Sequence, residues 1–394
     1  MPIASKQDVP RLLAAERVAL ALHREHDIAV ADRSHGDLDA GRRQCTVQAQ
    51  IAHHGGDHGV AGQVAASILK ELSAPIPRER SLRPWLYPFV PLWFLGLMLR
   101  PRPLRQAPVP VVAVGALTAG GSGKTPVAAW FAEKLADVDP VVVSRGYGRR
   151  PGEDVRLDGE APDLGDELVM LARRGIRVAS APDRMAGIEA AMKRGARLAV
   201  LDDALQYGDV GRDLEVVVID ARWPRGGGPI PVGTARVPVS WLAKADVVWV
   251  NHGPFPEELR HHVRADAIVV EARYRPTGWL FRGRRLPLDG IPRLPGAAFA
   301  GIARPTGFFH LVRSVGVELD RTWVFPDHHA YVWGDLQSIE AWLDDHIVVT
   351  TEKDAARLPP TVSAYVLLVD LEITRGAEAL EARLAALRAK VAPR

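Results

Sequence analysis

The chain has one cysteine, no apolar run long enough to cross a bilayer and little net charge, and each shortage excludes a class of protein. Cys45 has no second cysteine to pair with, so an intramolecular disulfide is excluded and a reducing compartment is indicated. A formal net charge of +3 over 394 residues gives no electrostatic argument for nucleic acid, and no nucleic acid partner is expected. The first residues lack a basic segment, an apolar core and a cleavage site of small residues, so we expect no secretion signal.

The composition that remains is that of a folded protein of one or two domains. Hydrophobic residues make up 47% of the chain and charged residues 25%, the balance of ordinary globular proteins. From Val109 onward, apolar segments alternate with helical patterns. The strand candidates are VPVVAVGAL, DPVVVSRG, RLAVLDDA, LEVVVIDA, ADVVWVNH, AAFAGIA and DHIVVTTE. This alternation predicts an α/β fold with a mostly parallel sheet, which binds ligands at the carboxyl ends of its strands.

Residues 1–75 form an extension to which we assign no role. They contain a predicted short helix, VPRLLAAERVALAL, and a polar stretch that ends in HHGGDHG. The histidines and the aspartate of that stretch favour a solvated linker, with a metal site as the alternative.

Residues 76–106 form an apolar and basic segment. Its apolar stretch, Trp85 to Leu99, is too short for a usual transmembrane helix. Aromatic residues at one end and Arg100, Arg102 and Arg105 at the other predict a membrane-associating helix in the lipid interface. The alternative is a helix packed against the domain.

The segment TAGGSGKTP, residues 118–126, lies between a predicted strand and a predicted helix. In a P-loop, backbone N–H groups surround the phosphates and glycines permit the unusual dihedral angles. Lys124 is expected to reach the β- and γ-phosphates, and Thr125 to bind Mg²⁺. A plain strand-to-helix connector is the alternative. The expected nucleotide-binding residues are Thr118, Ala119, Gly120, Gly121, Ser122, Gly123, Lys124 and Thr125.

A second predicted strand, RLAVLDDA, ends in Asp202 and Asp203. Carboxylates at this place in a P-loop protein hold Mg²⁺ directly or through water. Thr125, Asp202 and Asp203 therefore form the predicted metal site, although paired aspartates at a strand end are also found as helix caps.

Seven segments occur together in one order: VGALTAGGSGKTP, SRGYGRR, GDELVMLARR, APDRMAG, LDDALQY, FPDHHAY and TTEKDA. By these segments the chain resembles the tetraacyldisaccharide 4′-kinase family over about residues 80–385. The resemblance implies transfer of the γ-phosphate of ATP, with Mg²⁺, to the 4′-hydroxyl of an acylated glucosamine disaccharide 1-phosphate, giving lipid IVA. It also implies a peripheral enzyme on the cytoplasmic face of the bacterial inner membrane. No obligate protein partner is expected.

The resemblance also implies residue roles. Asp166 of the GDE segment and His328, the first histidine of DHH, correspond to a pair that accepts the proton of the attacking hydroxyl. A helix cap and a loop residue are the plain alternatives for the two. Arg145 and Arg184 are candidates for binding the acidic phospho-sugar, because guanidinium groups bind phosphate bidentately. TTEKDA is expected at the interdomain or nucleotide site, with no assigned task.

Four residues depart from the family pattern, namely Ala116, Ala204, Tyr207 and Val237. Val237 replaces a glutamate that helps to organise the metal. Two other functions stay open. HHGGDHG favours a P-loop NTPase switch or metallochaperone, and Val237 and Ala204 favour a kinase-derived nucleotide-binding protein with an impaired metal site. The expected architecture is a P-loop kinase domain over 107–235, followed by a smaller C-terminal α/β lobe over 236–394 that completes the sheet and the active site.

Overall fold

The computed structural model describes residues 84–90, 93, 103–146, 149, 152, 154–158, 161–343, 345–359 and 361–391. The extension 1–75, with its HHGGDHG stretch, lies outside the described residues, as does much of the expected membrane-contacting segment. Within that segment, Pro84–Phe89 forms a 3-10 helix, η1. Among the described residues, no helix has the length and apolar character needed to cross a membrane.

Twelve strands of the described chain form one sheet, in the order β10-β9-β11-β12-β7-β6-β5-β1-β4-β2-β3, with β8 paired to β7. The β7–β12 and β7–β8 pairs are antiparallel and the other pairs are parallel. The expected α/β class with a mostly parallel sheet is thus confirmed. The strands are β1 Val111–Ala116, β2 Pro140–Ser144, β3 Val178–Ser180, β4 Leu198–Leu201, β5 Leu214–Asp220, β6 Val247–Asn251, β7 Ile268–Phe281, β8 Arg284–Leu286, β9 Gly296–Ala300, β10 Leu319–Val324, β11 Ile347–Thr351 and β12 Tyr365–Arg375.

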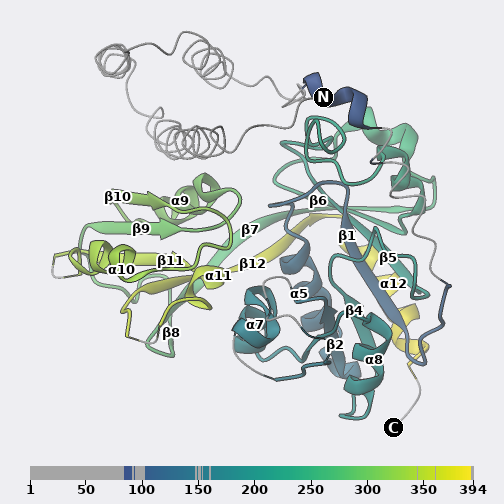
Figure 1. Cartoon of the computed structure of the whole chain (residues 1–394), viewed down its shortest axis with the longest axis horizontal. Helices are drawn as coiled ribbons and strands as arrows, with labels where there is room; N and C mark the ends of the chain where they lie inside the picture. The colour runs from purple at the N-terminus through teal and green to yellow at the C-terminus, as the bar shows by residue number, and fades with distance from the viewer. Residues whose placement is uncertain are drawn as a thin grey trace, which may run out of the picture. The chain divides into compact units, whose positions relative to one another are not determined.

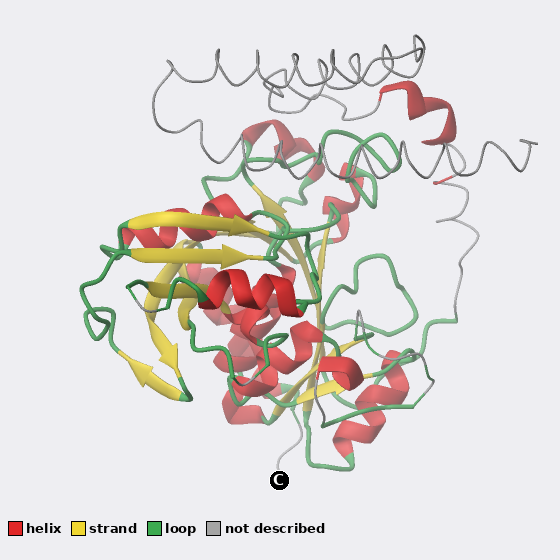
Figure 2. Ribbon diagram, turned by 60° about the vertical axis from the view of Figure 1, so that its left-hand side comes forward, coloured by secondary structure: helices red, strands yellow, loops and turns green. Residues whose placement is uncertain are grey.

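Helices cover both faces of the sheet (Figure 2). They are α5 Lys124–Lys134, η2 Ala136–Val138, α6 Ala161–Leu164, α7 Asp166–Arg173, α8 Arg184–Met192, η3 Val239–Lys244, η4 Glu257–His262, α9 Pro305–Ser314, α10 Trp333–Glu340, α11 Glu352–Ala355 and α12 Ala377–Ala389. All six residues of β1 are buried, which explains its unbroken apolar sequence. Alternate residues serve opposite faces: Val112 packs in the core that includes Phe131 of α5, and Val111 in the core that includes Ile188 of α8.

The long antiparallel pair β7 and β12 connects two hydrophobic cores. Ala272 of β7 and Leu371 of β12 are buried in the core around α5, whereas Trp279 of β7 and Leu367 of β12 are buried against α9. Figure 1 shows β9, β10 and β11 on one side of this pair and β1, β4 and β2 on the other. Since Leu384 of α12 also packs in the first core, the residues expected in the C-terminal lobe contribute to both cores. The boundary at residue 235 stays a prediction.

Candidate active site

The loop between β1 and α5 is held in a conformation that glycine favours. Gly120, Gly121 and Gly123 have φ values of 63°, 61° and 83°, in the left-handed region. A Cβ at Gly123 would collide with the hydroxyl of Tyr274 and lie 2.6 Å from the amide nitrogen of Asn251. The loop therefore lies directly against β6 and β7.

Two neighbours fix the course of this loop. Nδ2 of Asn251 donates a hydrogen bond of 2.9 Å to the carbonyl of Ser122. On the other side, the N–H of Ala119 donates to the carbonyl of Thr234 at 2.7 Å, and Thr118 forms a bridge with Ala235. Because both ends are tied to other elements, the loop has a defined shape before any ligand enters.

The structure brings Lys124 and Thr125 to the two aspartates that directly follow β4. Oγ1 of Thr125 donates to Oδ2 of Asp202 at 2.8 Å. Nζ of Lys124 lies 3.5 Å from Oδ1 of Asp203, and Arg236 donates to Oδ2 of the same carboxylate at 2.7 Å. A triphosphate in the loop would give the lysine a new anionic partner, while Arg236 would keep Asp203 paired.

Asp202 has the chemical properties of a cation ligand. Its side chain is buried, and Oδ1 has no hydrogen-bond partner among the described residues. Burial, with the negative charges of Glu167 and Asp203, raises the pKa of Asp202 to about 7. Carboxylate and hydroxyl oxygens are the ligands that Mg²⁺ prefers, so Thr125 and Asp202 fit it chemically. Within the described ranges, no group of three or more His, Cys, Asp or Glu could hold a metal, so further ligands would come from phosphate or water.

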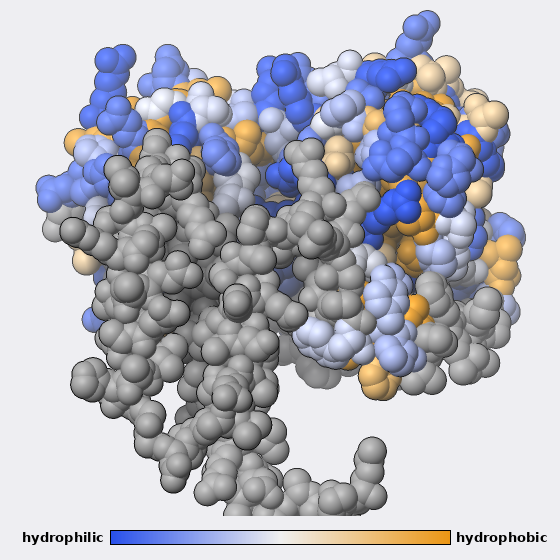
Figure 3. Space-filling view, turned by 90° about the horizontal axis from the view of Figure 1, so that it is seen from above, coloured by the Kyte–Doolittle hydropathy of each residue, from blue (hydrophilic) through white to orange (hydrophobic). Residues whose placement is uncertain are grey.

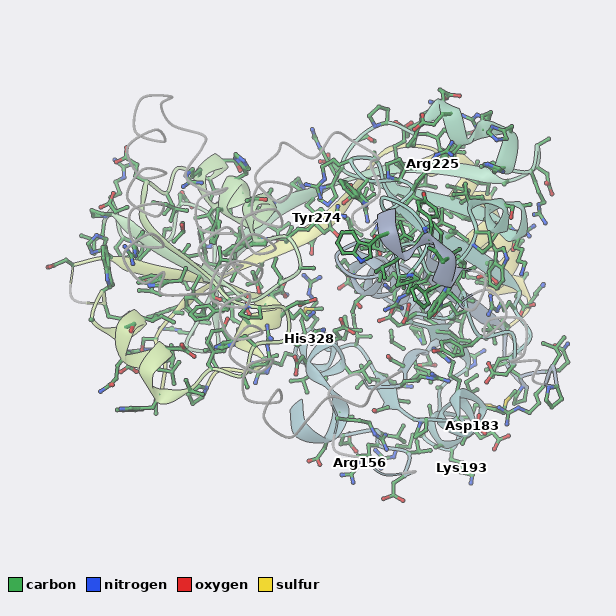
Figure 4. All side chains as sticks on the ribbon, turned by 45° about the horizontal axis from the view of Figure 1, so that its top comes forward. Arg156, Asp183, Lys193, Arg225, Tyr274 and His328 are labelled. Atoms are coloured by element: carbon green, nitrogen blue, oxygen red, sulfur yellow. The ribbon has the colours of Figure 1, made fainter. Side chains whose placement is uncertain are left out.

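Asp166 and His328, which lie 162 residues apart, meet in the structure. Nδ1 of His328 is 3.1 Å from Oδ2 of Asp166 (Figure 4 labels His328). Asp166 is the first residue of α7 and Gly165 is its N-cap, so Asp166 does not cap the helix. His328 has a φ of 59°, an unusual conformation for a residue other than glycine. A backbone that places one imidazole against one carboxylate in this way favours a functional role over a loop role.

The TTEKDA segment ends β11 and forms α11 directly beside that pair. Nζ of Lys353 lies 3.1 Å from Nε2 of His328. Thr351 is the N-cap of α11, since its Oγ1 accepts from the N–H of Asp354 at 3.0 Å. The Asp354 carboxylate is fully buried and accepts from the N–H of Gly301 and the hydroxyl of Tyr331. Asp354 therefore anchors the segment, while Lys353 reaches the site.

Arg145 and Arg184 both contact Tyr207, one of the residues that depart from the family pattern. The guanidinium carbon of Arg145 lies 3.8 Å from the centre of the Tyr207 ring and that of Arg184 lies 4.7 Å from it. Burial, together with the positive charge of Arg145, lowers the pKa of Arg184. Nε of Arg145, and Nε and Nη1 of Arg184, are buried without a partner among the described residues. Unpaired N–H donors on two adjacent cations favour the binding of an anion.

The other departures are buried in apolar surroundings. Val237 packs with Leu117, Leu205 and Leu242, and Ala204 and Ala116 are also buried. Position 237 thus contributes packing instead of a carboxylate. Three residues of the site were not predicted from the sequence, namely Arg236, Asn251 and Tyr274. Asn251 could have been predicted, because it is a polar residue at the end of an apolar predicted strand, like Asp202.

A strand, a glycine loop, a helix that begins with Lys-Thr and a carboxylate at the end of the neighbouring parallel strand define a P-loop α/β protein. A model of the family tetraacyldisaccharide-1-P 4′-kinase (LpxK) matches residues 82–388, and the chain belongs to that family. The resemblance seen in the sequence is confirmed.

Individual relatives agree with this assignment. The chain is 38% identical to the tetraacyldisaccharide 4′-kinase of Anaeromyxobacter dehalogenans (strain 2CP-C), over 83% of this chain and 92% of that protein. It is 39% identical to that of Methylobacterium nodulans, over 73% and 86%. A crystal structure of LpxK from Aquifex aeolicus in complex with ATP has a similar fold, with a TM-score of 0.66 and 23% identity, over 78% of this chain and 99% of that one.

Proposed function

We propose that this site transfers the γ-phosphoryl group of ATP to the 4′-hydroxyl of an acylated glucosamine disaccharide 1-phosphate, with Asp166 as the proton acceptor. The activity, that of a tetraacyldisaccharide 4′-kinase in lipid A biosynthesis, follows from the family. One observation carries the assignment of the residues. The negative charge of Glu167 contributes to the raised pKa of Asp202, and its neighbour Asp166 contacts His328, which favours one shared site for the phosphate loop and the proton acceptor.

The donor side is formed by the loop from Thr118 to Thr125. Its backbone N–H groups and the ammonium of Lys124 bind the triphosphate of ATP. Thr125 and Asp202, with Asp203, are the residues that would hold Mg²⁺. When bound, Mg²⁺ neutralises charge on the phosphate oxygens. The 2.8 Å bond from Thr125 to Asp202 supports this ligand set, since it already places two oxygens of the set together.

The acceptor side is formed by Asp166 and His328. As the oxygen of the 4′-hydroxyl bonds to the γ-phosphorus, the bond from that phosphorus to the β–γ bridging oxygen breaks and ADP leaves. The hydroxyl proton passes to the Asp166 carboxylate. Both His328 and Arg357 approach Oδ2 of Asp166, at 3.1 Å and 3.5 Å, which leaves Oδ1 for the substrate.

The unpaired donors of Arg145 and Arg184 suit the phosphate group of the acceptor. Arg184 lies at the carboxyl end of β4, because its Nη2 donates to the carbonyl of Asp203 at 2.9 Å. Arg145 lies beside it, against the same Tyr207 ring. A phosphate group on the sugar would complete their hydrogen bonds and relieve the repulsion between the two cations.

Exposed aromatic residues support contact with a membrane surface. Trp85, Tyr87 and Phe89 of η1 are 63%, 52% and 52% exposed, far more than aromatic side chains in a core. Aromatic rings of this kind favour the headgroup region of a bilayer. On the face seen in Figure 3, orange apolar patches lie among blue polar ones. We place the chain peripherally on the cytoplasmic face of the inner membrane, where its acylated acceptor is embedded and ATP is present.

One assay separates this function from its alternatives. The purified chain is incubated with ATP, Mg²⁺ and radiolabelled disaccharide acceptor, and lipid product and free phosphate are both measured. Phosphorylated lipid supports the kinase. Free phosphate without lipid product supports an NTPase switch. Neither product, with ATP still bound, supports a binding protein in which Val237 has impaired the metal site.

Matched variants then test the role of Asp166 in the same assay. Asp166→Asn should lower kcat by about 10²- to 10⁴-fold and retain ATP binding. Asp266→Asn removes a carboxylate that is 77% exposed and paired with Arg264, and should behave as the wild type. Unchanged turnover in Asp166→Asn would contradict its role as proton acceptor.

A further inference from the structure

The TTEKDA segment, residues 350–355, is the motif to which the proposed function assigns no chemical task. Thr351 and Asp354 cap and anchor α11, as described above. The side chains of Glu352 and Lys353 instead contact α7, the helix that begins with Asp166. These two charged side chains are the part of the motif that anchoring does not explain.

Lys353 has an anionic or basic partner for each of its three N–H donors. Its Nζ is 3.0 Å from Oδ1 of Asp327, 3.1 Å from Nε2 of His328 and 3.5 Å from Oε1 of Glu167. An ammonium group has three donors and no acceptor. Nε2 of His328 must therefore accept the hydrogen bond from Lys353, and so it carries no proton.

The other ring nitrogen of His328 faces an acceptor. Nδ1 lies 3.1 Å from Oδ2 of Asp166, and a carboxylate accepts hydrogen bonds. A neutral imidazole has one donor and one acceptor, and the hydrogen-bond network assigns them here: Nδ1–H donates to Asp166, and Nε2 accepts from Lys353. The opposite tautomer would place two donors against each other at Nε2 and two acceptors at Nδ1.

We propose that Lys353 is a positioning residue for phosphoryl transfer, which holds His328 in the tautomer that donates to Asp166. This rests on the proposed function, since it concerns the proton acceptor of that reaction. With Nε2 occupied by Lys353, His328 does not receive the proton of the acceptor hydroxyl. That proton passes to Asp166, which is oriented by His328 through Oδ2. Lys353 acts on the reaction through His328.

Glu352 provides a second contact between the TTEKDA segment and α7. Nε of Arg174, the C-cap of α7, donates to Oε1 of Glu352 at 2.8 Å. Nη2 of Arg174 also donates to the carbonyl of Val369 at 2.7 Å. Lys353 therefore contacts the first turn of α7 through Glu167, and Glu352 holds its end. The short helix α11 thus contacts both ends of α7, and these contacts set the position of Asp166 relative to His328.

Nitrogen NMR of the imidazoles measures the tautomer without any turnover. The protein is labelled with ¹⁵N-histidine, and the His328 signals are identified as those missing in His328→Asn. In the wild type at neutral pH, we expect a proton-free Nε2 and a protonated Nδ1. In Lys353→Met, the two nitrogens should move toward the averaged values of a mixed population. A protonated Nε2 in the wild type, or identical His328 signals in Lys353→Met, would overturn the proposal.

Kinetics separate positioning from a general structural role. Lys353→Met should lower kcat about 10²-fold with KM for ATP unchanged, and Lys353→Arg, which keeps N–H donors, should recover most of that loss. Lys390→Met is the matched control, because Lys390 pairs with Asp213 ahead of β5, at the opposite end of the strands. Equal losses in Lys353→Met and Lys353→Arg, or a changed KM for ATP, would contradict positioning. A wild type without lipid product would refute the proposed function alone, because the tautomer is read independently.

Discussion

Oγ1 of Thr125 donates a hydrogen bond of 2.8 Å to Oδ2 of Asp202, which joins the helix of the phosphate loop to the end of the neighbouring strand. Thr125→Val keeps the shape of the side chain and removes this donor and one proposed Mg²⁺ ligand. We expect kcat/KM to fall about 10- to 100-fold and the Mg²⁺ concentration needed for half-maximal rate to rise. Thr125→Ser keeps the hydroxyl and should stay near the wild type. If Thr125→Val retained the wild-type Mg²⁺ dependence, the hydroxyl would not be a ligand.

Tyr207 orders Arg145 and Arg184 through its ring, since both guanidinium groups lie against it. Tyr207→Ala should raise KM for the acceptor about 3- to 30-fold, corresponding to the loss of one or two cation–π contacts. KM for ATP should not change. Tyr207→Phe keeps the ring without its hydroxyl and is the matched control. An equal rise in KM for both variants would assign the effect to the hydroxyl instead of the ring.

Gly123 is constrained both by its φ of 83° and by its neighbours Tyr274 and Asn251. Gly123→Ala should unfold at lower denaturant than the wild type and bind ATP weakly, because the new Cβ displaces the loop from β7. Gly175 has a φ of 85° and no atom within 4 Å of a built Cβ, so Gly175→Ala measures the backbone strain alone, about 1 kcal/mol.

The difference between these two alanine variants is the cost of the collision. The double variant Gly123→Ala, Tyr274→Phe should recover part of the ATP affinity, since it removes the hydroxyl that the Cβ meets. If Gly123→Ala and Gly175→Ala lost equal stability and both bound ATP normally, close packing against the loop would not matter.

The seven strands predicted from the sequence are parallel strands that read as apolar runs, as the fully buried β1 and β5 do. The parallel strands β3 and β10 were not among the candidates. Nor did the sequence indicate β7 or β12. Their residues alternate between buried and exposed, charged side chains interrupt them, and Pro276 lies within β7. The antiparallel pair that joins the two cores was therefore missed, and so was the division of residues 236–394 between those cores.

The site residues that belong to short motifs were found for a similar reason, since local spacing alone places Lys124 and Thr125 at the start of a helix. Contacts between distant segments leave no such local pattern. Nothing in the spacing of TTEKDA indicates that Lys353 contacts His328 and Glu352 contacts Arg174, because each contact depends on how α11 packs against α7. The pairing of Asp166 with His328 was anticipated only through the resemblance to a family.

Asp220, at the end of β5, is a buried carboxylate that three basic side chains surround. Arg222 donates to it through Nε at 3.0 Å and Nη2 at 2.8 Å, Arg304 at the N-cap of α9 pairs with it, and Nε2 of His252 is 3.9 Å away. Burial raises the pKa of Asp220, but the hydrogen bond from Arg222 and the charges of Arg304 and Arg222 outweigh it. The pKa of Asp220 therefore lies below its usual value.

A carboxyl group whose pKa is lower in the folded than in the unfolded protein stabilises the fold at pH values above the unfolded pKa. That contribution is lost as the pH falls through the folded pKa. Asp220→Asn should thus reduce the free energy of unfolding at pH 7 by about 2 kcal/mol, the typical worth of hydrogen bonds to a charged group. As the pH falls below about 4, where the carboxyl of the unfolded protein protonates, the two proteins should begin to converge, and they should become equal below the lower pKa of the folded protein. Denaturant unfolding from pH 3 to 7 measures this.

Arg304→Met and Arg222→Met show which arginine carries the effect. Arg222 makes two side-chain hydrogen bonds to the carboxylate, so its loss should destabilise the protein more than the loss of Arg304. Arg304 is the N-cap of α9, however, and its Cγ lies 3.3 Å from a Cβ built on Gly121. Its removal should therefore affect ATP binding more than stability. A stability difference between wild type and Asp220→Asn that stayed constant over the whole pH range would show that Asp220 contributes through packing and not through its charge.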